Sequence, residues 1–251
     1  MDTPTPFTHL HVHSQYSLLD GKASVKGLVD RAIELGMRGL ALTDHGNMFG
    51  IKEFYNYVAK KNADRPEGEK FKPILGCEMY VAKDRLTDKK DKRDNGYHLI
   101  VLAKNQTGYH NLIKLVSKAW SEGFYYKPRT DRHELETHHE GLIVCSACLG
   151  GEVPQMILQG TPEEAEERAL WYKKVFGDDY YLELQRHQTF KENANKEVYE
   201  EQIKVNEVLL DIAKRHNIKT VATNDVHFVK EDDGEAHDRL ICISMNKSFY
   251  E

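Results

Sequence analysis

The chain has 251 residues, of which 40% are hydrophobic and 30% are charged, and these values fit a folded protein with an apolar core. Because 40 acidic residues outnumber 35 lysines and arginines, the net charge of −5 excludes a uniformly basic nucleic-acid surface but permits a local groove. The four cysteines show no disulfide-framework spacing, and we find no signal peptide or long apolar run, so we expect a cytoplasmic protein with reduced thiols and no membrane partner.

The first predicted element lies in the stretch from Phe7 to Asp20. His9, His11 and His13 occupy alternate positions there, with apolar or β-branched residues between them. A period of two is typical of a β-strand, so the three imidazoles share one face. Because imidazole is a common ligand of zinc, manganese and iron, the pattern predicts metal binding; a histidine-rich surface strand is the alternative.

Helices and strands are then expected in alternation. Ser24 is suited to cap a helix with apolar positions at helical spacing, and Gly36 is suited to end it. The further expected elements are a strand at 39–43, a helix from about 48 to 61, a strand at 73–81, a strand at 97–102, a helix at 108–120, a strand at 142–145, a helix beginning at 161, a strand at 180–184, a helix at 195–216, a strand at 219–223 and a helical tail from 231.

Two segments have no clear periodicity. Residues 83–95 form a charge run and are expected to be a solvated loop, whereas residues 121–141 form a long mixed loop that is either functional or flexible. Lys127 and Arg129 in this second loop could hold a phosphate or a DNA backbone through charge-assisted hydrogen bonds. An ordinary surface loop is the alternative.

The seven strands alternating with helices predict a mostly parallel α/β sheet or barrel. Side chains that can bind metal follow the C-terminal ends of different strands, which is the edge where α/β barrels build their sites. They are His11, His13, Asp44, His45, Glu78, Cys148, Asp225 and His227. His98 is the exception, because it lies early in its strand and by itself is more typical of a core histidine.

This set of donors exceeds the four ligands that one zinc ion usually takes. The excess predicts two or three metal ions that share bridging carboxylates, and such sites suit phosphoester hydrolysis. Asp44 could orient a ligand histidine from behind, and Asp20 before Gly21 could be a simple turn residue. Cys77 and Cys145 are expected to pack in the core. The histidines without a strand-end motif are expected at the surface: His110, His133, His138, His139, His187, His216 and His237.

Several motifs resemble those of the polymerase and histidinol phosphatase (PHP) family. They are the segments 9–14, 42–46, 76–78 and 224–227. More narrowly, residues 16–21, 124–129 and 146–151 resemble the N-terminal PHP domain of bacterial replicative DNA polymerase III alpha subunits. The tail around 237–243 resembles the passage into the polymerase part. The resemblance therefore implies a metal-binding domain at 1–230 and the start of that passage at 231–251 of a longer protein.

The resemblance implies a distorted (β/α)7 barrel and a cluster of two or three zinc, manganese or iron ions. Its implied ligands are His11, His13, Asp20, His45, Glu78, His98, Cys148, Asp225 and His227, with Glu78 as the bridging carboxylate. His9 stands where many relatives have aspartate, so we place it with Asp44 behind the ligands. Cys148 stands where phosphatase relatives have histidine, and a thiolate favours zinc or iron over magnesium.

The resemblance also implies a role in DNA replication. The first hypothesis is a metal-dependent 3′–5′ exonuclease domain that removes misincorporated nucleotides, within a nucleotidyltransferase whose polymerase activity lies elsewhere. The second is a non-catalytic module for stability and for docking a separate proofreading subunit. The third is a free-standing phosphoesterase similar to histidinol phosphatase. The implied partners are DNA, the remainder of the alpha subunit, and a proofreading subunit or sliding clamp.

Overall fold

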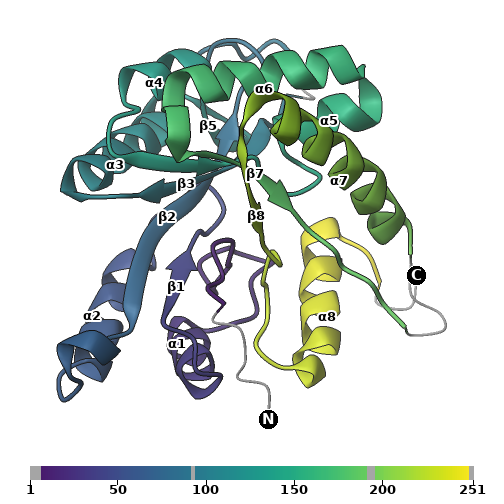
Figure 1. Cartoon of the computed structure of the whole chain (residues 1–251). Coiled ribbons are helices and arrows are strands. Elements are labelled where there is room, and N and C mark those ends of the chain that lie inside the picture. The colour runs from purple at the N-terminus through teal and green to yellow at the C-terminus, as the bar shows by residue number, and fades with distance from the viewer. Residues whose placement is uncertain (1–6, 92–93, 191–195, 249–251) are drawn as a thin grey trace. The chain divides into compact units, whose positions relative to one another are not determined.

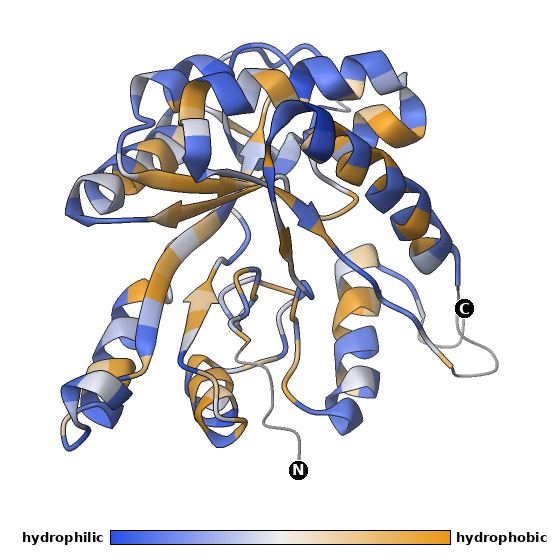
Figure 2. Ribbon diagram, viewed as in Figure 1, coloured by the Kyte–Doolittle hydropathy of each residue, from blue (hydrophilic) through white to orange (hydrophobic). Residues whose placement is uncertain are grey.

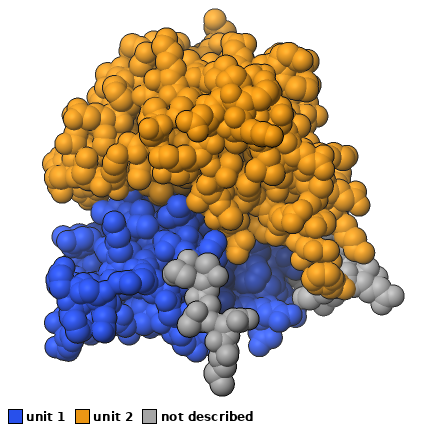
Figure 3. Space-filling model, in the orientation of Figure 1, with its two compact units in different colours: residues 1–77, 225–251 blue, residues 78–224 orange. Residues whose placement is uncertain are grey.

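The structure is a computed structural model that describes residues 7–91, 94–190 and 196–248 (Figure 1). The chain divides into two compact units: unit 1 comprises residues 1–77 and 225–251, and unit 2 comprises residues 78–224 (Figure 3). Strands and helices alternate along the chain, so the predicted α/β class is confirmed. Among the described residues, no helix combines the length and apolar character needed to cross a membrane.

Unit 1 contains both ends of the described chain. Its elements are α1 (Val25–Glu34), β1 (Gly39–Leu42), α2 (Ile51–Lys61), the short helix η1 (Glu67–Glu69), the first part of β2 (Lys72–Val81), η3 (Glu231–Asp233) and α8 (Gly234–Met245). The predicted first helix is confirmed, because Ser24 accepts a hydrogen bond from the amide of Gly27 and the apolar stripe is buried. The second helix begins at Ile51, three residues later than expected. β1 runs parallel to the start of β2.

The histidine segment at 9–13 is not the regular strand that its alternation predicts, because the chain bends at Leu10 and His11. Val12 forms one isolated parallel bridge with Val226, and the amides of Ala41 and Thr43 donate to the carbonyls of His9 and Val12. The segment forms only a few hydrogen bonds with either neighbour. On one side β1 ends at Leu42, and on the other side the chain around Val226 is irregular.

Unit 2 is built around a mixed sheet. Its elements are the end of β2, β3 (Tyr97–Ala103), α3 (Gln106–Ser121), β4 (Phe124–Tyr125), β5 (Lys127–Thr130), α4 (Arg132–Thr137), β6 (Leu142–Cys145), α5 (Glu152–Gln159), α6 (Pro162–Phe176), η2 (Gly177–Asp179), β7 (Tyr180–Leu184), α7 (Glu197–His216) and β8 (Lys219–Ala222). The strand order is β4-β5-β2-β3-β6-β7-β8. β3 runs antiparallel to β6, whereas β6, β7 and β8 are mutually parallel.

Helices pack against this sheet through one apolar side. α3 contacts β3 and β5, α6 contacts β6 and β7, and α7 contacts β7 and β8. Figure 2 shows the corresponding division, with hydrophobic strands and helices that carry both hydrophobic and hydrophilic residues. The predicted capping box at Thr161 and Glu164 starts α6. The expected first residue of α7, Asn195, lies outside the described residues.

The expectation of a long loop at 121–141 is wrong. Tyr126 adopts a left-handed conformation (φ 59°) that turns β4 back against β5, and α4 follows. Helix α5 is a further element that the sequence reasoning missed. The side chain of Arg129 in β5 points into the core and is fully buried.

The buried guanidinium of Arg129 fastens the charge run at 83–95 to β5. Its Nη1 donates to the carboxylate of Asp94 at 2.9 Å, and its Nη2 donates to the carbonyls of Leu86 and Asp88 at 3.2 and 2.6 Å. Its Nε donates to the carbonyl of Gly123 at 3.3 Å. The prediction that Arg129 contacts phosphate or DNA is therefore wrong, because the group is buried and its donors are engaged. Lys127 is exposed, and its contact with phosphate stays a prediction.

We predict that Arg129→Met lowers the free energy of unfolding by about 3–5 kcal/mol, because Asp94 and several carbonyls lose a buried partner. The matched control is Lys127→Met, since the exposed Nζ of Lys127 lies 5.3 Å from the centre of the Tyr80 ring. Loss of that contact costs about 0.5–1 kcal/mol. Denaturant unfolding measures both values, and equal losses would contradict the anchoring role.

Candidate metal centre

His11 and His13 of unit 1 are aimed at one carboxylate. Both imidazoles are fully buried, and their Nε2 atoms lie 3.1 and 3.2 Å from Oδ1 of Asp225. Burial alone would raise the pKa of Asp225, but the neighbouring imidazoles of His11 and His13 hold this pKa well below its usual range. The carboxylate is therefore ionised and can attract a cation.

The backbone of Asp225 is strained. Its φ of 48° lies in the left-handed region, which non-glycine residues seldom adopt and in which Asp and Asn are tolerated best. Asp225 and His227 were expected just beyond the C-terminal end of the last strand. They lie in one cluster beyond β8, which ends at Ala222, and the left-handed turn aims Asp225 toward the histidines.

Asp20 forms the second carboxylate of the unit 1 cluster. Its Oδ2 lies 2.6 Å from Nε2 of His45 and 3.0 Å from Nε2 of His227. Burial would raise the pKa of Asp20, but the nearby imidazoles of His227, His237 and His45 lower it well below its usual value. The expected alternative of a simple turn residue does not explain these contacts.

His13 lies between the other two histidines. Its ring stacks on that of His227 at 4.3 Å and is tilted against that of His45 at 4.1 Å. The three residues offer nitrogen atoms that all lie within 4.8 Å of one another. Donors this close can meet on a single ion.

A buried relay fixes the tautomer of His13. Ser17 donates its hydroxyl proton to Asp44 at 2.8 Å, so its oxygen accepts from Nδ1 of His13 at 2.9 Å. Neutral His13 therefore keeps a lone pair on Nε2, which faces Oδ1 of Asp225. A lone pair and a carboxylate oxygen repel unless a proton or metal ion lies between them, so the donor chemistry fits a bound cation.

Asp44 thus acts on His13 through a hydroxyl group. It accepts from the amide and hydroxyl of Ser14, at 2.6 and 2.8 Å, as well as from Ser17. Burial raises its pKa although these hydrogen bonds oppose the shift. Sequence reasoning expected Asp44 behind a ligand histidine but missed Ser14 and Ser17, whose only signal is their position just after the histidines.

Unit 2 carries a second cluster. Oε1 of the fully buried Glu78 lies 3.1 Å from Nδ1 of His98, and Sγ of Cys148 lies 3.5 Å from the same nitrogen. The three residues offer donors within 4.8 Å of one another. An open cavity of about 470 Å³ lies beside His98, and Lys83 and Gln155 are among its lining residues.

The antiparallel pairing of β3 and β6 explains why His98 is near these donors. Ile100 lies opposite Cys145, so the beginning of β3 lies beside the end of β6 and the turn that carries Cys148. His98 therefore reaches this edge although it is early in its strand. Gly150 permits the approach, because a Cβ there would lie 3.0 Å from Nδ1 of His98.

The nine predicted ligands fall into two groups. Those in unit 1 are His11, His13, Asp20, His45, Asp225 and His227, and those in unit 2 are Glu78, His98 and Cys148. Their roles as ligands stay predictions. His9 packs edge-on against Phe7 and lines an apolar hollow, and burial lowers its pKa.

The remaining cysteines and histidines have ordinary environments with one exception. Cys77 and Cys145 are buried, as expected. His110, His133, His139 and His187 are exposed as predicted, and His138 and His216 are half-buried. His237 contradicts the surface expectation, because its side chain is 14% exposed and its Nε2 lies 3.4 Å from Oδ1 of Asp20.

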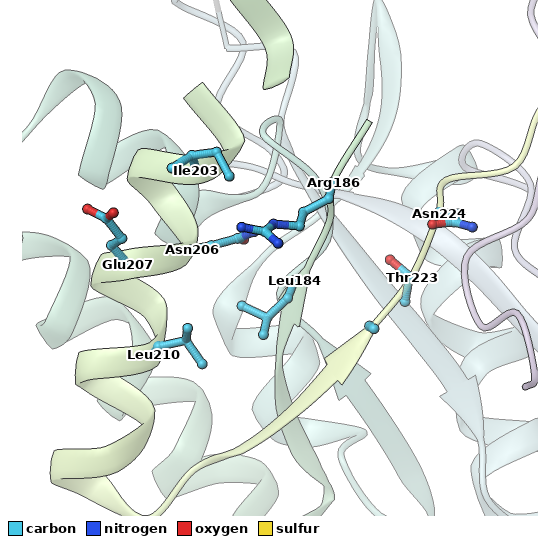
Figure 4. A pocket seen from close by; sticks show the side chains of 9 residues that line it. Leu184, Arg186, Ile203, Asn206, Glu207, Leu210, Thr223 and Asn224 are labelled. Atoms are coloured by element: carbon cyan, nitrogen blue, oxygen red, sulfur yellow. The ribbon is translucent and has the colours of Figure 1, made fainter. Parts of the chain in front are cut away.

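A further cavity in unit 2 is distinct from both clusters. It has a volume of about 450 Å³ and is lined by Leu184, Arg186, Ile203, Asn206, Glu207, Leu210, Ala222, Thr223 and Asn224. Figure 4 shows the guanidinium of Arg186 pointing toward Asn206 across an apolar floor. Its lining includes none of the nine predicted ligands, so it is not part of the candidate centre.

Comparison with known proteins supports the same grouping. The sequence pattern of the PHP domain family matches residues 9–187. The chain is 45% identical over 239 residues to the DNA polymerase III subunit alpha of Borreliella burgdorferi, covering 94% of this chain and 19% of that protein. It is 43% identical over 248 residues to the same subunit of Thermus aquaticus, covering 97% and 19%. The chain therefore spans about a fifth of the length of these relatives.

Two solved structures share the fold. A protein from Bifidobacterium adolescentis assigned as a metal-dependent phosphoesterase has a TM-score of 0.52 at 16% identity, covering 96% of this chain and 97% of its own. An amidohydrolase from Chromobacterium violaceum has a TM-score of 0.50 at 15% identity, covering 90% and 89%. Together with the family match, the first likeness confirms the predicted PHP-type fold.

We predict that Ser17→Ala weakens metal binding by about 10–100-fold, because His13 loses the partner that fixes its tautomer. Ser17→Thr keeps the hydroxyl and is the matched control. Competition with a chelator measures the affinity, and circular dichroism checks the fold. An unchanged affinity in a folded Ser17→Ala protein would show that the relay does not prepare His13.

We predict that Cys148→Ser loses metal from unit 2, whereas Cys145→Ser changes stability at most. Cys148 is partly exposed beside His98, but Cys145 is buried within β6. A metal-bound thiol is deprotonated and shielded, so metal should slow the reaction of Cys148 with a thiol reagent until a chelator is added. Equal rates with and without metal would rule out the thiolate as a ligand.

Proposed function

Because the chain belongs to the PHP domain family, we propose that it is the N-terminal domain of a bacterial DNA polymerase III alpha subunit that hydrolyses phosphodiester bonds with bound divalent metals. The reaction would be 3′–5′ exonucleolytic removal of misincorporated nucleotides during replication. Similarity to alpha subunits along almost the whole chain supports this assignment over a free-standing phosphatase.

The proposal rests on the nine candidate metal ligands and their contacts with one another. Each of the nine residues that the family resemblance implies as a ligand contacts at least one other member of its own cluster. An unused site would have no need to keep buried histidines facing strongly acidic carboxylates, since such groups are costly to bury. The B. adolescentis protein with a similar fold is assigned as a metal-dependent phosphoesterase, and that assignment is consistent with the proposed chemistry.

We propose two or three zinc, manganese or iron ions. In unit 1, His13, His45 and His227 would hold one, with Asp20 and Asp225 supplying negative charge. In unit 2, Glu78, His98 and Cys148 would hold another, and the thiolate favours zinc or iron there. Bound metals would supply hydroxide near neutral pH and stabilise the leaving oxygen.

The protein groups near His98 suit a phosphate substrate. The cavity beside His98 is open, and Lys83 lines it. Nζ of Lys83 lies 3.5 Å from an exposed carboxylate of Asp91, a weak surface pair that a phosphate could replace. We propose that this cavity admits the end of a DNA strand.

The proposed partners follow from the relatives. Single-stranded DNA is the substrate, and the remainder of the alpha subunit would carry the polymerase activity. A proofreading subunit or sliding clamp would join them in the assembled enzyme, and chromosome replication would place the chain in the cytoplasm. Residues 231–251 would begin the passage into the polymerase part, while the boundary at residue 230 stays a prediction.

The test uses the purified chain with manganese or zinc, 5′-labelled single-stranded DNA, and histidinol phosphate in a parallel reaction. We expect a ladder of shortened DNA with an intact 5′ label and little phosphate from histidinol phosphate. Asp225→Asn should abolish the ladder and weaken metal binding, because a neutral amide is a poorer ligand. Chelation should have the same effect.

Three outcomes would overturn the proposed reaction. Metal-loaded chain that leaves both substrates intact would indicate a non-catalytic docking domain. Rapid release of phosphate from histidinol phosphate with intact DNA would indicate a small-molecule phosphatase. A ladder that Asp225→Asn leaves unchanged would indicate a contaminating nuclease.

A further inference from the structure

His237 lies on a helix that sequence reasoning placed outside the metal-binding domain. It is in the first turn of α8, and its side chain is 14% exposed. Its Nε2 lies 3.4 Å from Oδ1 of Asp20, and its ring centre lies 5.4 Å from that of His227. His237 therefore lies beside the unit 1 cluster, although it comes more than two hundred residues after Asp20 in the sequence.

The two oxygens of Asp20 face different partners. Oδ2 faces His45 and His227, which are predicted ligands, whereas Oδ1 faces His237. A metal shared with His45 and His227 would use the Oδ2 side. An imidazole on the other oxygen can then donate an N–H and hold the carboxylate in place, as residues behind metal ligands commonly do.

A second observation concerns the hydrogen bonding of Nε2 of His237. Nε2 is buried from solvent, and no aligned hydrogen bond to it exists among the described residues. A buried imidazole nitrogen without a partner is unfavourable, and the nearby carboxylate oxygen of Asp20 can meet the need. Anything that fixes Asp20 therefore favours the docked position of His237.

Helix α8 has few other attachments to the core of unit 1. None of its described residues is fully buried, and Ile243 and Met245 near its end are 65% and 56% exposed. Just before the helix, Asp233 of η3 forms a surface ion pair with Lys22. Surface pairs contribute little to stability, whereas His237 is a half-buried tie between the helix and the unit.

We infer that His237 is a positioning residue that orients Asp20 for metal binding and thereby couples the docking of α8 to metal occupancy. The coupling is reciprocal, because a docked helix that strengthens metal binding must itself be stabilised by metal. This inference rests on the proposed metal centre, but it does not depend on any catalytic turnover.

The experiment measures metal affinity in the whole chain by competition with a chelator, using zinc or manganese alone. His237→Ala should weaken the tightest unit 1 site by about 10–100-fold, the range typical of lost outer partners of a metal ligand. His237→Gln keeps an N–H donor and should recover part of the loss. Arg239→Gln is the matched control on α8, because Arg239 pairs with the exposed carboxylate of Glu235 on the same helix, and it should bind metal as the parent chain does.

Hydrogen exchange of residues 234–245 supplies a second measurement. Metal should slow exchange across α8 in the parent chain and in Arg239→Gln, and it should have no such effect in His237→Ala. The parent chain alone keeps the inference testable if the alanine variant does not fold. Exchange that ignores metal in the parent chain, or an unchanged affinity in folded His237→Ala, would overturn the role of His237.

These outcomes are separable from those of the proposed reaction. A chain that binds metal with the expected dependence on His237 but cleaves no DNA would overturn the exonuclease and retain the coupling. A chain that cleaves DNA while exchange in α8 ignores metal would do the reverse.

Discussion

The pairing of buried or half-buried imidazoles with half-buried carboxylates is the interaction on which the candidate centre depends. His11 and His13 are removed from water and share one oxygen of Asp225, while His45 and His227 share one oxygen of Asp20. Buried charges of this kind are costly unless each has an opposite partner. Three features bring these opposite partners together. They are the histidine segment at 9–13, the left-handed turn at Asp225 and the Ser17 relay.

Local patterns were enough to predict much of the fold. Alternating apolar runs located β1, β2, β3, β6, β7 and β8, and capping residues located the start of α1 and α6. The ligand motifs were visible because several of them follow strand ends, where the chain must turn. His98 did not fit this rule, since its place depends on β3 running antiparallel to β6, and strand direction is a property of the whole sheet.

The features that the sequence did not reveal depend on contacts between distant residues. Arginine is a common phosphate ligand, yet most of the groups that Arg129 contacts lie more than thirty residues earlier. Its burial was therefore not predictable from the residues beside it in the sequence. Ser17 is an ordinary hydroxyl until Asp44 accepts its proton. His237 lies in a helix without a metal-binding motif, and only folding brings it to Asp20. Each belongs to a network, which local periodicity does not encode.

The left-handed backbone of Asp225 has a consequence for how this position can change. Glycine would relieve the backbone strain, but it would leave His11 and His13 buried without their acceptor. Asparagine tolerates the same conformation and fills the same space, so it preserves the fold while removing the charge. The backbone conformation and the proposed metal binding therefore favour different residues at one position. In a chain that no longer has to bind metal, asparagine could replace aspartate at this position with little loss of stability. The substitution would mark the loss of metal binding.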